Sequence, residues 1–357
     1  MDTSADYWER ELTLMTEFDF DPFAPGQHDG RPAVFAELRE QGPIWHTDSN
    51  LWVVSRFEDV KAVNASPDLF SSRPNPYEGD SADTHEEMSQ EILDRILVIA
   101  SDMSVDLGEM AASRAIAGAD PPEHTRMRRI VSRGFTPPRI AEMAAAVDEI
   151  VDGCIDGIAE GTPFDVVERL AIPLPVEMIC HILGIDPEHY GDVKRWSDSF
   201  ASAAVGDHAR SPEGQLMMLS TLKEFSDFFV PLVEARRADP QSDLISTMIR
   251  AIDDDSLTTI ETMSMAITIM VAGNETSTNL IGNTVVELLS NPEQLDLLTK
   301  NPSLLPNAIE ESNRLTAPIQ FTFREARQDT EVGGTKIPKG SIVVLHLAAA
   351  NRDPRQF

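Results

Sequence analysis

The chain has few basic residues and few cysteines for its length. Its 357 residues include 29 lysines and arginines against 60 aspartates and glutamates, which gives a formal net charge of −31. This charge repels phosphate backbones and anionic lipid surfaces, so we expect neither nucleic acid nor a membrane as a partner. Cys154 and Cys180 are too few for a disulfide framework, and a reducing cytoplasm is the predicted location.

Long hydrophobic segments are also missing. Residues 1–20 contain neither the basic segment nor the apolar core of a signal peptide. The longest apolar runs, at 266–272 and 342–350, are far shorter than the roughly 20 residues that span a bilayer. The 41% of hydrophobic and 25% of charged residues are ordinary for a globular protein, so the chain can bury a sizeable core.

Helical patterns dominate the chain between residues 91 and 300, where prolines mark the helix boundaries. Strand patterns occur near both ends, at 51–57 and 330–347. The sequence therefore predicts a mainly α fold with small β portions. Because the strand patterns flank one helical body, we expect a single domain over residues 1–357.

One long helix is predicted between a capping box at 258–261 and the Asn291-Pro292 pair. About 33 residues at 1.5 Å each give a rod of about 50 Å. Its middle is apolar almost all round, so we expect residues 272–276 to lie deep inside the protein.

Residues 272–276 read Ala-Gly-Asn-Glu-Thr, an unusual sequence for a buried helix. Gly273 costs about 1 kcal/mol of helix stability relative to alanine, and Glu275 is costly to bury without a partner. The Thr276 hydroxyl can bond back to the carbonyl four residues earlier and open a small groove beside Gly273. The alternative is a helix kink with a satisfied threonine.

Three further segments accompany this helix. A double proline opens a helix at 121–129 on which His124 and Arg128 share a face, as suits an anionic ligand. Glu311 and Arg314 stand three residues apart on another helix. The third segment begins at Phe323-Arg324 and ends with Asn-Arg-Asp-Pro at 351–354.

In this order, the four segments resemble the cytochrome P-450 superfamily, the haem-thiolate monooxygenases, and look like a soluble bacterial member. The resemblance implies a cytochrome P-450 fold, a haem b cofactor, O2, a hydrophobic small-molecule substrate and a ferredoxin-type electron donor. It also implies insertion of one oxygen atom into that substrate. A thiolate ligand favours O–O cleavage, and the bound oxygen needs protons.

The resemblance assigns roles to individual residues. The catalytic acid–alcohol pair is Glu275 and Thr276. The expected cofactor contacts are His124, Arg128 and Arg324 for the haem propionates, and Ala272 and Gly273 for the oxygen-side groove. The structural ion pair is Glu311 and Arg314, which we expect to be paired and buried. The expected substrate pocket includes Met265, Ile269, Ile319 and Phe321, although Met265 and Ile269 could equally be core residues of any helical protein.

The iron ligand has no match. The family's cysteine lies in a Phe-Gly-x-Gly-x-His-x-Cys loop beyond the Asn-Arg-Asp-Pro segment, whereas this sequence stops at Phe357. Cys154 and Cys180 lack the flanking glycines and histidine, and a buried cysteine usually behaves as a small hydrophobe. We therefore expect a fold that is C-terminally incomplete, no metal ligand, and no catalysis by the fragment itself.

Two alternatives remain open. The chain could be a non-catalytic fragment or pseudoenzyme that binds a hydrophobic ligand, or a helical protein that docks an acidic partner. The second alternative rests on a basic cluster, which consists of Arg126, Arg128, Arg129, Arg133 and Arg139. In a monooxygenase the same cluster is a candidate docking surface for the acidic electron donor; otherwise it is a solvated helix face.

Overall fold

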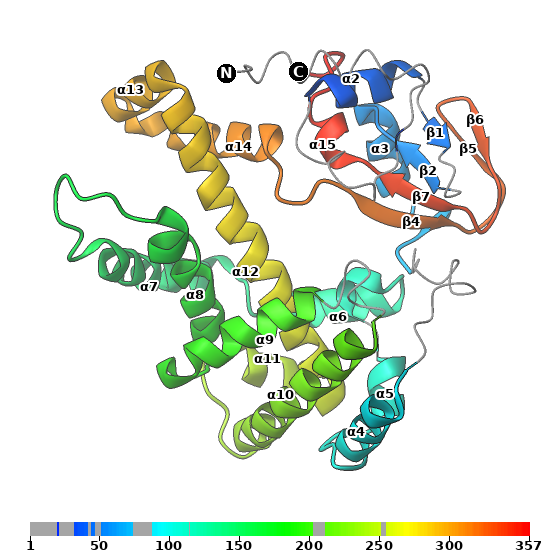
Figure 1. Ribbon diagram of the computed structural model, residues 1–357, viewed down its shortest axis with the longest axis vertical. Helices are drawn as coiled ribbons and strands as arrows, with labels where there is room; N and C mark the ends of the chain where they lie inside the picture. The colour runs from blue at the N-terminus through cyan, green and yellow to red at the C-terminus, as the bar shows by residue number, and fades with distance from the viewer. Residues whose placement is uncertain are drawn as a thin grey trace. The chain divides into compact units, whose positions relative to one another are not determined.

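The computed structural model describes residues 20, 32–41, 44–46, 51–73, 88–113, 115–202, 211–250 and 255–357. Backbone contacts divide the chain into two compact units (Figure 1). The sheet unit contains residues 1–74 and 310–357, and the helical unit contains residues 75–309. The expectation of a single domain stays a prediction.

Strands from both ends of the chain build the sheet unit. Its elements are α2 (Pro32–Gln41), β1 (Ile44–His46), β2 (Leu51–Val54), α3 (Phe57–Asn64), β3 (Phe70–Ser71), β4 (Thr322–Ala326), β5 (Thr330–Val332), β6 (Thr335–Ile337), β7 (Ile342–Leu345) and α15 (Leu347–Ala350). The main sheet has the order β1-β2-β7-β4-β3. β2 and β7 pair in parallel and place Val53 opposite Val344, whereas the other pairs are antiparallel. The strands predicted near both ends are thus confirmed.

Both faces of this sheet are buried. Successive residues of a strand point to opposite faces, so Val343 and Leu345 of β7 belong to one apolar cluster and Val344 to another. α3 contributes to the first cluster through Val60 and Val63, and α2 contributes to the second. This double coverage explains why β7 reads as a continuous apolar run.

The helical unit is built around one long helix. Its elements are α4 (Gln90–Ser101), α5 (Leu107–Ala112), η1 (Ile116–Gly118), α6 (Glu123–Ser132), α7 (Pro137–Ile155), the π-helix η2 (Val167–Ala171), α8 (Pro173–Leu183), η3 (Pro187–His189), α9 (Tyr190–Ser202), α10 (Pro212–Ala238), α11 (Leu244–Ile249), α12 (Thr259–Ser290), α13 (Pro292–Lys300) and η5 (Pro302–Leu304). α14 (Leu305–Leu315) crosses the boundary between the two units. α12 packs mainly against α8 and α9. Within the described residues, no helix has the length and apolar character to cross a membrane.

α12 begins and ends where the sequence predicts. The Thr258 hydroxyl accepts a hydrogen bond from the Glu261 N–H at 3.1 Å, and the Glu261 carboxylate accepts one from the Thr258 N–H at 2.9 Å. This reciprocal capping box satisfies two N–H groups at the start of the helix. The helix ends at Ser290, directly before Asn291-Pro292.

The burial expected for residues 272–276 is wrong. Ala266, Met270 and Asn274 are buried, but Ala272 and Glu275 are exposed. Residues 262–266 near the start of α12 are all buried, but from Ala266 onward the buried residues recur every fourth position and form one face of the helix. An apolar sequence predicts that a helix can be buried, but how much of its surface is buried depends on the elements that pack around it. Here α12 packs mainly against α8 and α9.

Candidate functional site

The predicted acid–alcohol pair lies on an unbroken helix. The Thr276 hydroxyl donates to the carbonyl oxygen of Ala272 at 2.6 Å, four residues earlier in α12. This is the back-bond expected from the sequence. Because the single hydroxyl proton is used, the Thr276 oxygen is left as a hydrogen-bond acceptor. The exposed Glu275 carboxylate has no ion-pair or hydrogen-bond partner within the described ranges.

Gly273 faces α8. A Cβ added at Gly273 would lie 3.2 Å from Cδ1 and 3.3 Å from Cγ1 of Ile179, closer than ordinary van der Waals contact. The absence of a side chain therefore allows α12 and α8 to approach closely. This helix packing explains the presence of a glycine at position 273 without reference to a cofactor.

A pocket of about 460 Å³ lies between α7, α8 and α12. Ile269, Ala272 and Gly273 line it from α12, and its other lining residues are mostly apolar side chains of α7 and α8. Met265, which was also expected at a pocket, is 2% exposed and belongs to the core of the helical unit. The packing of Met265 thus favours the alternative of a core residue.

His124 and Arg128 lie one turn apart on α6, as predicted. The Arg128 side chain is exposed and that of His124 is half-buried. Among the residues that the structure describes, neither side chain has a hydrogen-bonding or charged partner. Two nitrogen donors on one helix face, both without a protein partner, suit a carboxylate ligand such as a propionate.

Other arginines of the basic cluster are engaged. Arg126 forms ion pairs with Glu261 and, at 3.4 Å, with Asp255, and Arg129 also pairs with Asp255. These pairs join α6 to the start of α12. Two of the cluster's charges are therefore compensated within the chain. Arg139 donates to the Thr247 hydroxyl at 3.0 Å.

Arg324 lies on β4 in the sheet unit. Its guanidinium donates to the Asn64 side chain at 2.7 Å and to the Phe323 carbonyl at 2.6 Å. Its predicted role as a propionate ligand stays a prediction. Of the expected substrate contacts in this unit, Ile319 is exposed, and Phe321 packs against the Phe323 ring at 5.4 Å.

Glu311 and Arg314 form the expected pair. Arg314 Nε and Nη2 bind the two carboxylate oxygens of Glu311 at 2.7 and 2.6 Å. The hydrogen bonds from Arg314 hold the pKa of Glu311 below its ordinary value. The pair is not buried as expected, because 56% of the Glu311 side chain is exposed against 22% for Arg314. An i, i+3 spacing predicts contact along a helix, but it does not predict what covers the helix.

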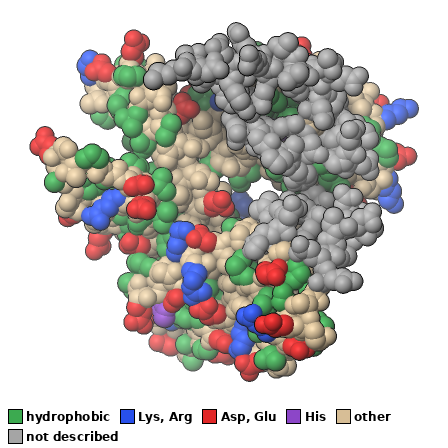
Figure 2. Space-filling model, viewed as in Figure 1, with side chains coloured by type: hydrophobic (Ala, Val, Ile, Leu, Met, Phe, Trp, Pro, Cys, Tyr) green, Lys and Arg blue, Asp and Glu red, His purple; other side chains and the backbone are tan. Residues whose placement is uncertain are grey.

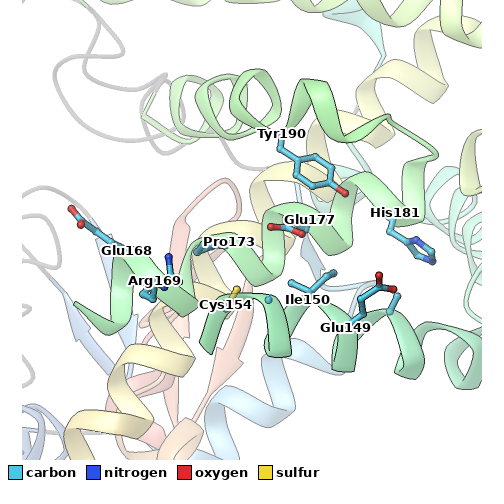
Figure 3. Close-up of a pocket in the computed structure, with 11 residues that line it drawn as sticks. Glu149, Ile150, Cys154, Glu168, Arg169, Pro173, Glu177, His181 and Tyr190 are labelled. Atoms are coloured by element: carbon cyan, nitrogen blue, oxygen red, sulfur yellow. The ribbon is translucent and has the colours of Figure 1, made fainter. Parts of the chain in front are cut away.

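Neither cysteine fits an iron. Both are buried, and burial together with nearby Glu177 raises the pKa of the Cys180 thiol to about 12. Cys154 lies on α7 and lines a second pocket of about 510 Å³ (Figure 3). Burial and Glu177 also raise the pKa of Cys154. Iron binds the thiolate, so these surroundings oppose ligation.

The rest of the described chain offers no other metal centre, because no group of three or more His, Cys, Asp or Glu side chains in it could hold a metal ion. The donors on α6 thus fit the propionates of a haem, while neither Cys154 nor Cys180 suits its thiolate ligand.

Comparisons with known proteins identify the family to which this chain is similar. The Cytochrome P450 family matches residues 211–357. The chain is 33% identical to 6-deoxyerythronolide B hydroxylase of Saccharopolyspora erythraea, and the match covers 97% of this chain and 81% of that protein. It is 31% identical to linalool 8-monooxygenase of Pseudomonas putida over 91% of this chain and 77% of that protein. The solved structure of cytochrome P450 CYP109Q5 from Chondromyces apiculatus is similar, with a TM-score of 0.76 and 31% identity over 95% of this chain and 79% of that one.

The chain therefore belongs to the cytochrome P450 family. Its fold is the mainly helical P450 fold, and its function is that of a haem-dependent monooxygenase, an oxidoreductase that uses haem b, O2, a hydrophobic substrate and a redox partner. The alternatives of a pseudoenzyme or a helical docking protein are not favoured.

Proposed function

We propose that Glu275 and Thr276 transfer protons during the reaction that inserts one oxygen atom from O2 into a hydrophobic small molecule. The observation that carries this proposal is the 2.6 Å bond from the Thr276 hydroxyl to the Ala272 carbonyl. It orients the hydroxyl so that its oxygen can accept a hydrogen bond from a protonated ligand. The exposed Glu275 carboxylate next to it can exchange protons with water.

The same proposal gives the donors on α6 the task of holding the cofactor. Haem, when bound, supplies the activation of dioxygen. His124 and Arg128 would hold its propionates by charge-assisted hydrogen bonds, with Arg324 as the third predicted contact. Ala272 and Gly273 remain the proposed oxygen-side residues, and Ile269, Ile319 and Phe321 remain proposed substrate contacts.

The redox partner is proposed to be an acidic, ferredoxin-type protein in the cytoplasm. The support is the basic cluster on and after α6, in a protein whose net charge is −31. On the face of the helical unit visible in Figure 2, basic side chains lie among acidic ones. A local excess of positive charge would orient an acidic donor during encounter.

The test replaces the Thr276 hydroxyl. Because neither Cys154 nor Cys180 suits the iron, the test uses a loop-bearing chimera. In this chimera, the chain is followed by the cysteine loop of 6-deoxyerythronolide B hydroxylase and by the sequence after that loop. Testosterone, present in a solved structure of the relative CYP109E1, serves as a hydrophobic probe. Thr276→Ala should raise the hydrogen peroxide released per electron pair about tenfold and leave testosterone affinity within twofold, because a methyl group cannot accept a hydrogen bond.

The matched control is Thr268→Ala, since Thr268 makes the same type of back-bond, to Ser264 at 2.8 Å, two turns earlier in α12. Thr276→Ser keeps the hydroxyl and should resemble the unchanged chimera. Equal peroxide release by Thr276→Ala and the unchanged chimera would refute the role of Thr276.

A further inference from the structure

Two polar contacts, one buried and one partly buried, flank Glu275 and Thr276 on α12. Asn274, which is 3% exposed, donates to the hydroxyl of Ser197 on α9 at 3.1 Å. Ser197, which is 2% exposed, in turn donates to the Met270 carbonyl at 3.1 Å. The α9 hydroxyl thus bridges one turn of α12, from residue 270 to residue 274.

The second contact lies one turn further along the same helix. The Thr278 hydroxyl donates to the carbonyl oxygen of Ala171 in the π-helix η2 at 2.9 Å. In an α-helix, this carbonyl would accept from the N–H of residue 175, but residue 175 is a proline and has none. Ala171 is fully buried, so Thr278 supplies a donor that the Pro173-x-Pro175 sequence removes from the local backbone.

These contacts share one face of α12, because residues 274 and 278 are one turn apart. Glu275 and Thr276 lie between them in sequence. A rotation or local opening of α12 that moved the acid–alcohol pair would therefore have to break one of the two contacts.

We infer that Asn274 and Thr278 are positioning residues, which clamp α12 to α9 and η2 and so fix the orientation of Glu275 and Thr276. Asn274 Oδ1 is buried without a hydrogen-bond partner in the described structure. An unpaired buried acceptor is costly, so it offsets part of the stability that the hydrogen bond from Asn274 to Ser197 contributes. This inference rests on the proposed role of Thr276.

The first measurement is amide hydrogen exchange in the 357-residue chain, resolved at residues 272–280. Ser197→Ala and Thr278→Val each remove one anchor and should speed exchange there roughly three- to tenfold, the range expected for one net hydrogen bond. Thr278→Ser keeps the hydroxyl and should restore the slow exchange. Thr268→Val and Ser202→Ala are the controls, since Thr268 and Ser202 bond only within their own helices, and both should leave this segment unchanged.

The second measurement uses the loop-bearing chimera with testosterone. Ser197→Ala and Thr278→Val should raise peroxide release per electron pair at least threefold, with testosterone affinity within twofold and with rescue by Thr278→Ser. Unchanged local exchange overturns the clamp. Faster exchange with unchanged peroxide release overturns the positioning role, because the contacts then only stabilise the fold. If Thr276→Ala alone has no effect, the proposed function fails, and the clamp is judged on the exchange data.

Discussion

Arg314 binds both carboxylate oxygens of Glu311, but the two residues differ in their other contacts and in their exposure. Arg314 Nη1 also donates to the Asn351 carbonyl at 2.6 Å, and its guanidinium lies 4.8 Å from the centre of the Phe357 ring. Glu311 has a largely exposed side chain. The arginine thus connects α14 to the segment that follows α15, whereas the glutamate mainly orients the arginine.

Replacement of these two residues should have unequal effects. Glu311→Gln should lower the free energy of unfolding by at most about 1 kcal/mol, because an exposed ion pair contributes little. Arg314→Leu should lower it by about 1–3 kcal/mol, since the Asn351 carbonyl loses its charged donor. Urea unfolding at pH 7 measures both values. A loss for Glu311→Gln as large as that for Arg314→Leu would contradict this division.

Asp353 should make the protein sensitive to acid. Its side chain is 3% exposed and accepts hydrogen bonds from the Phe57 and Arg355 backbone N–H groups, each at 3.1 Å. Burial raises the pKa of Asp353, but these hydrogen bonds and the hydrogen-bonded, charged guanidinium of Arg355 together outweigh burial and bring the pKa below its ordinary value. A lowered folded-state pKa contributes stability that is complete above the unfolded pKa of about 3.9 and is lost as the pH falls through the folded pKa.

Asp353→Asn should therefore cost about 1–3 kcal/mol at pH 7, and the difference from the unchanged protein should shrink as the pH falls below about 4. Urea unfolding between pH 3 and pH 7 tests this. Glu331→Gln is the control, because Glu331 is an exposed acid of the same unit, and its effect should stay near zero. A difference for Asp353→Asn that is independent of pH would show that its charge is not involved.

The two cysteines should be unreactive in the folded chain. At pH 8 the Cys180 thiol, with its pKa raised to about 12, is almost fully protonated, and the thiolate is the reactive form. Iodoacetamide should modify neither Cys154 nor Cys180 until urea is added.

For the same reason, haem added to the 357-residue chain should give a ferrous carbonyl spectrum without the red-shifted band of cysteine-ligated haem. That band, lost on Cys154→Ser or Cys180→Ser, would overturn our reading of the cysteines.

The sequence predicts contacts between residues that are close together in the chain. The capping box of α12 joins residues three apart, and the Thr276 back-bond joins residues four apart. Helix geometry alone brings such groups together. The Glu311–Arg314 contact is predictable for the same reason.

Features that depend on distant segments were missed. The contact of Asn274 with Ser197 spans 77 residues, and that of Thr278 with Ala171 spans 107. A polar residue on the otherwise apolar face that includes Ala266 and Met270 was the available signal for Asn274. It marks a buried polar contact, but it does not identify the partner, because that depends on how the helices pack.

The docking role of the basic cluster can be tested through Asp255, which pairs with two of its arginines. Arg126 is paired with Asp255 and Glu261, so a reversed charge there would sit beside two acids and disturb the fold. Asp255→Asn instead removes one compensating charge and leaves the arginines in place. If the cluster docks an acidic donor, Asp255→Asn should speed donor-driven reduction of the loop-bearing chimera, and Arg129→Gln should slow it.

Both effects should be clear at 0.1 M salt and nearly absent at 1 M, because the Debye length falls from about 10 Å to about 3 Å. Stopped-flow reduction by a plant-type ferredoxin measures them, and Lys300→Gln on α13, a 71% exposed charge away from α6, is the control. Arg128→Gln should behave differently and speed haem loss at every salt concentration, since its proposed partner is a propionate. A reduction rate that is independent of salt, or the same response in all the arginine variants, would mean that the cluster is a solvated helix face.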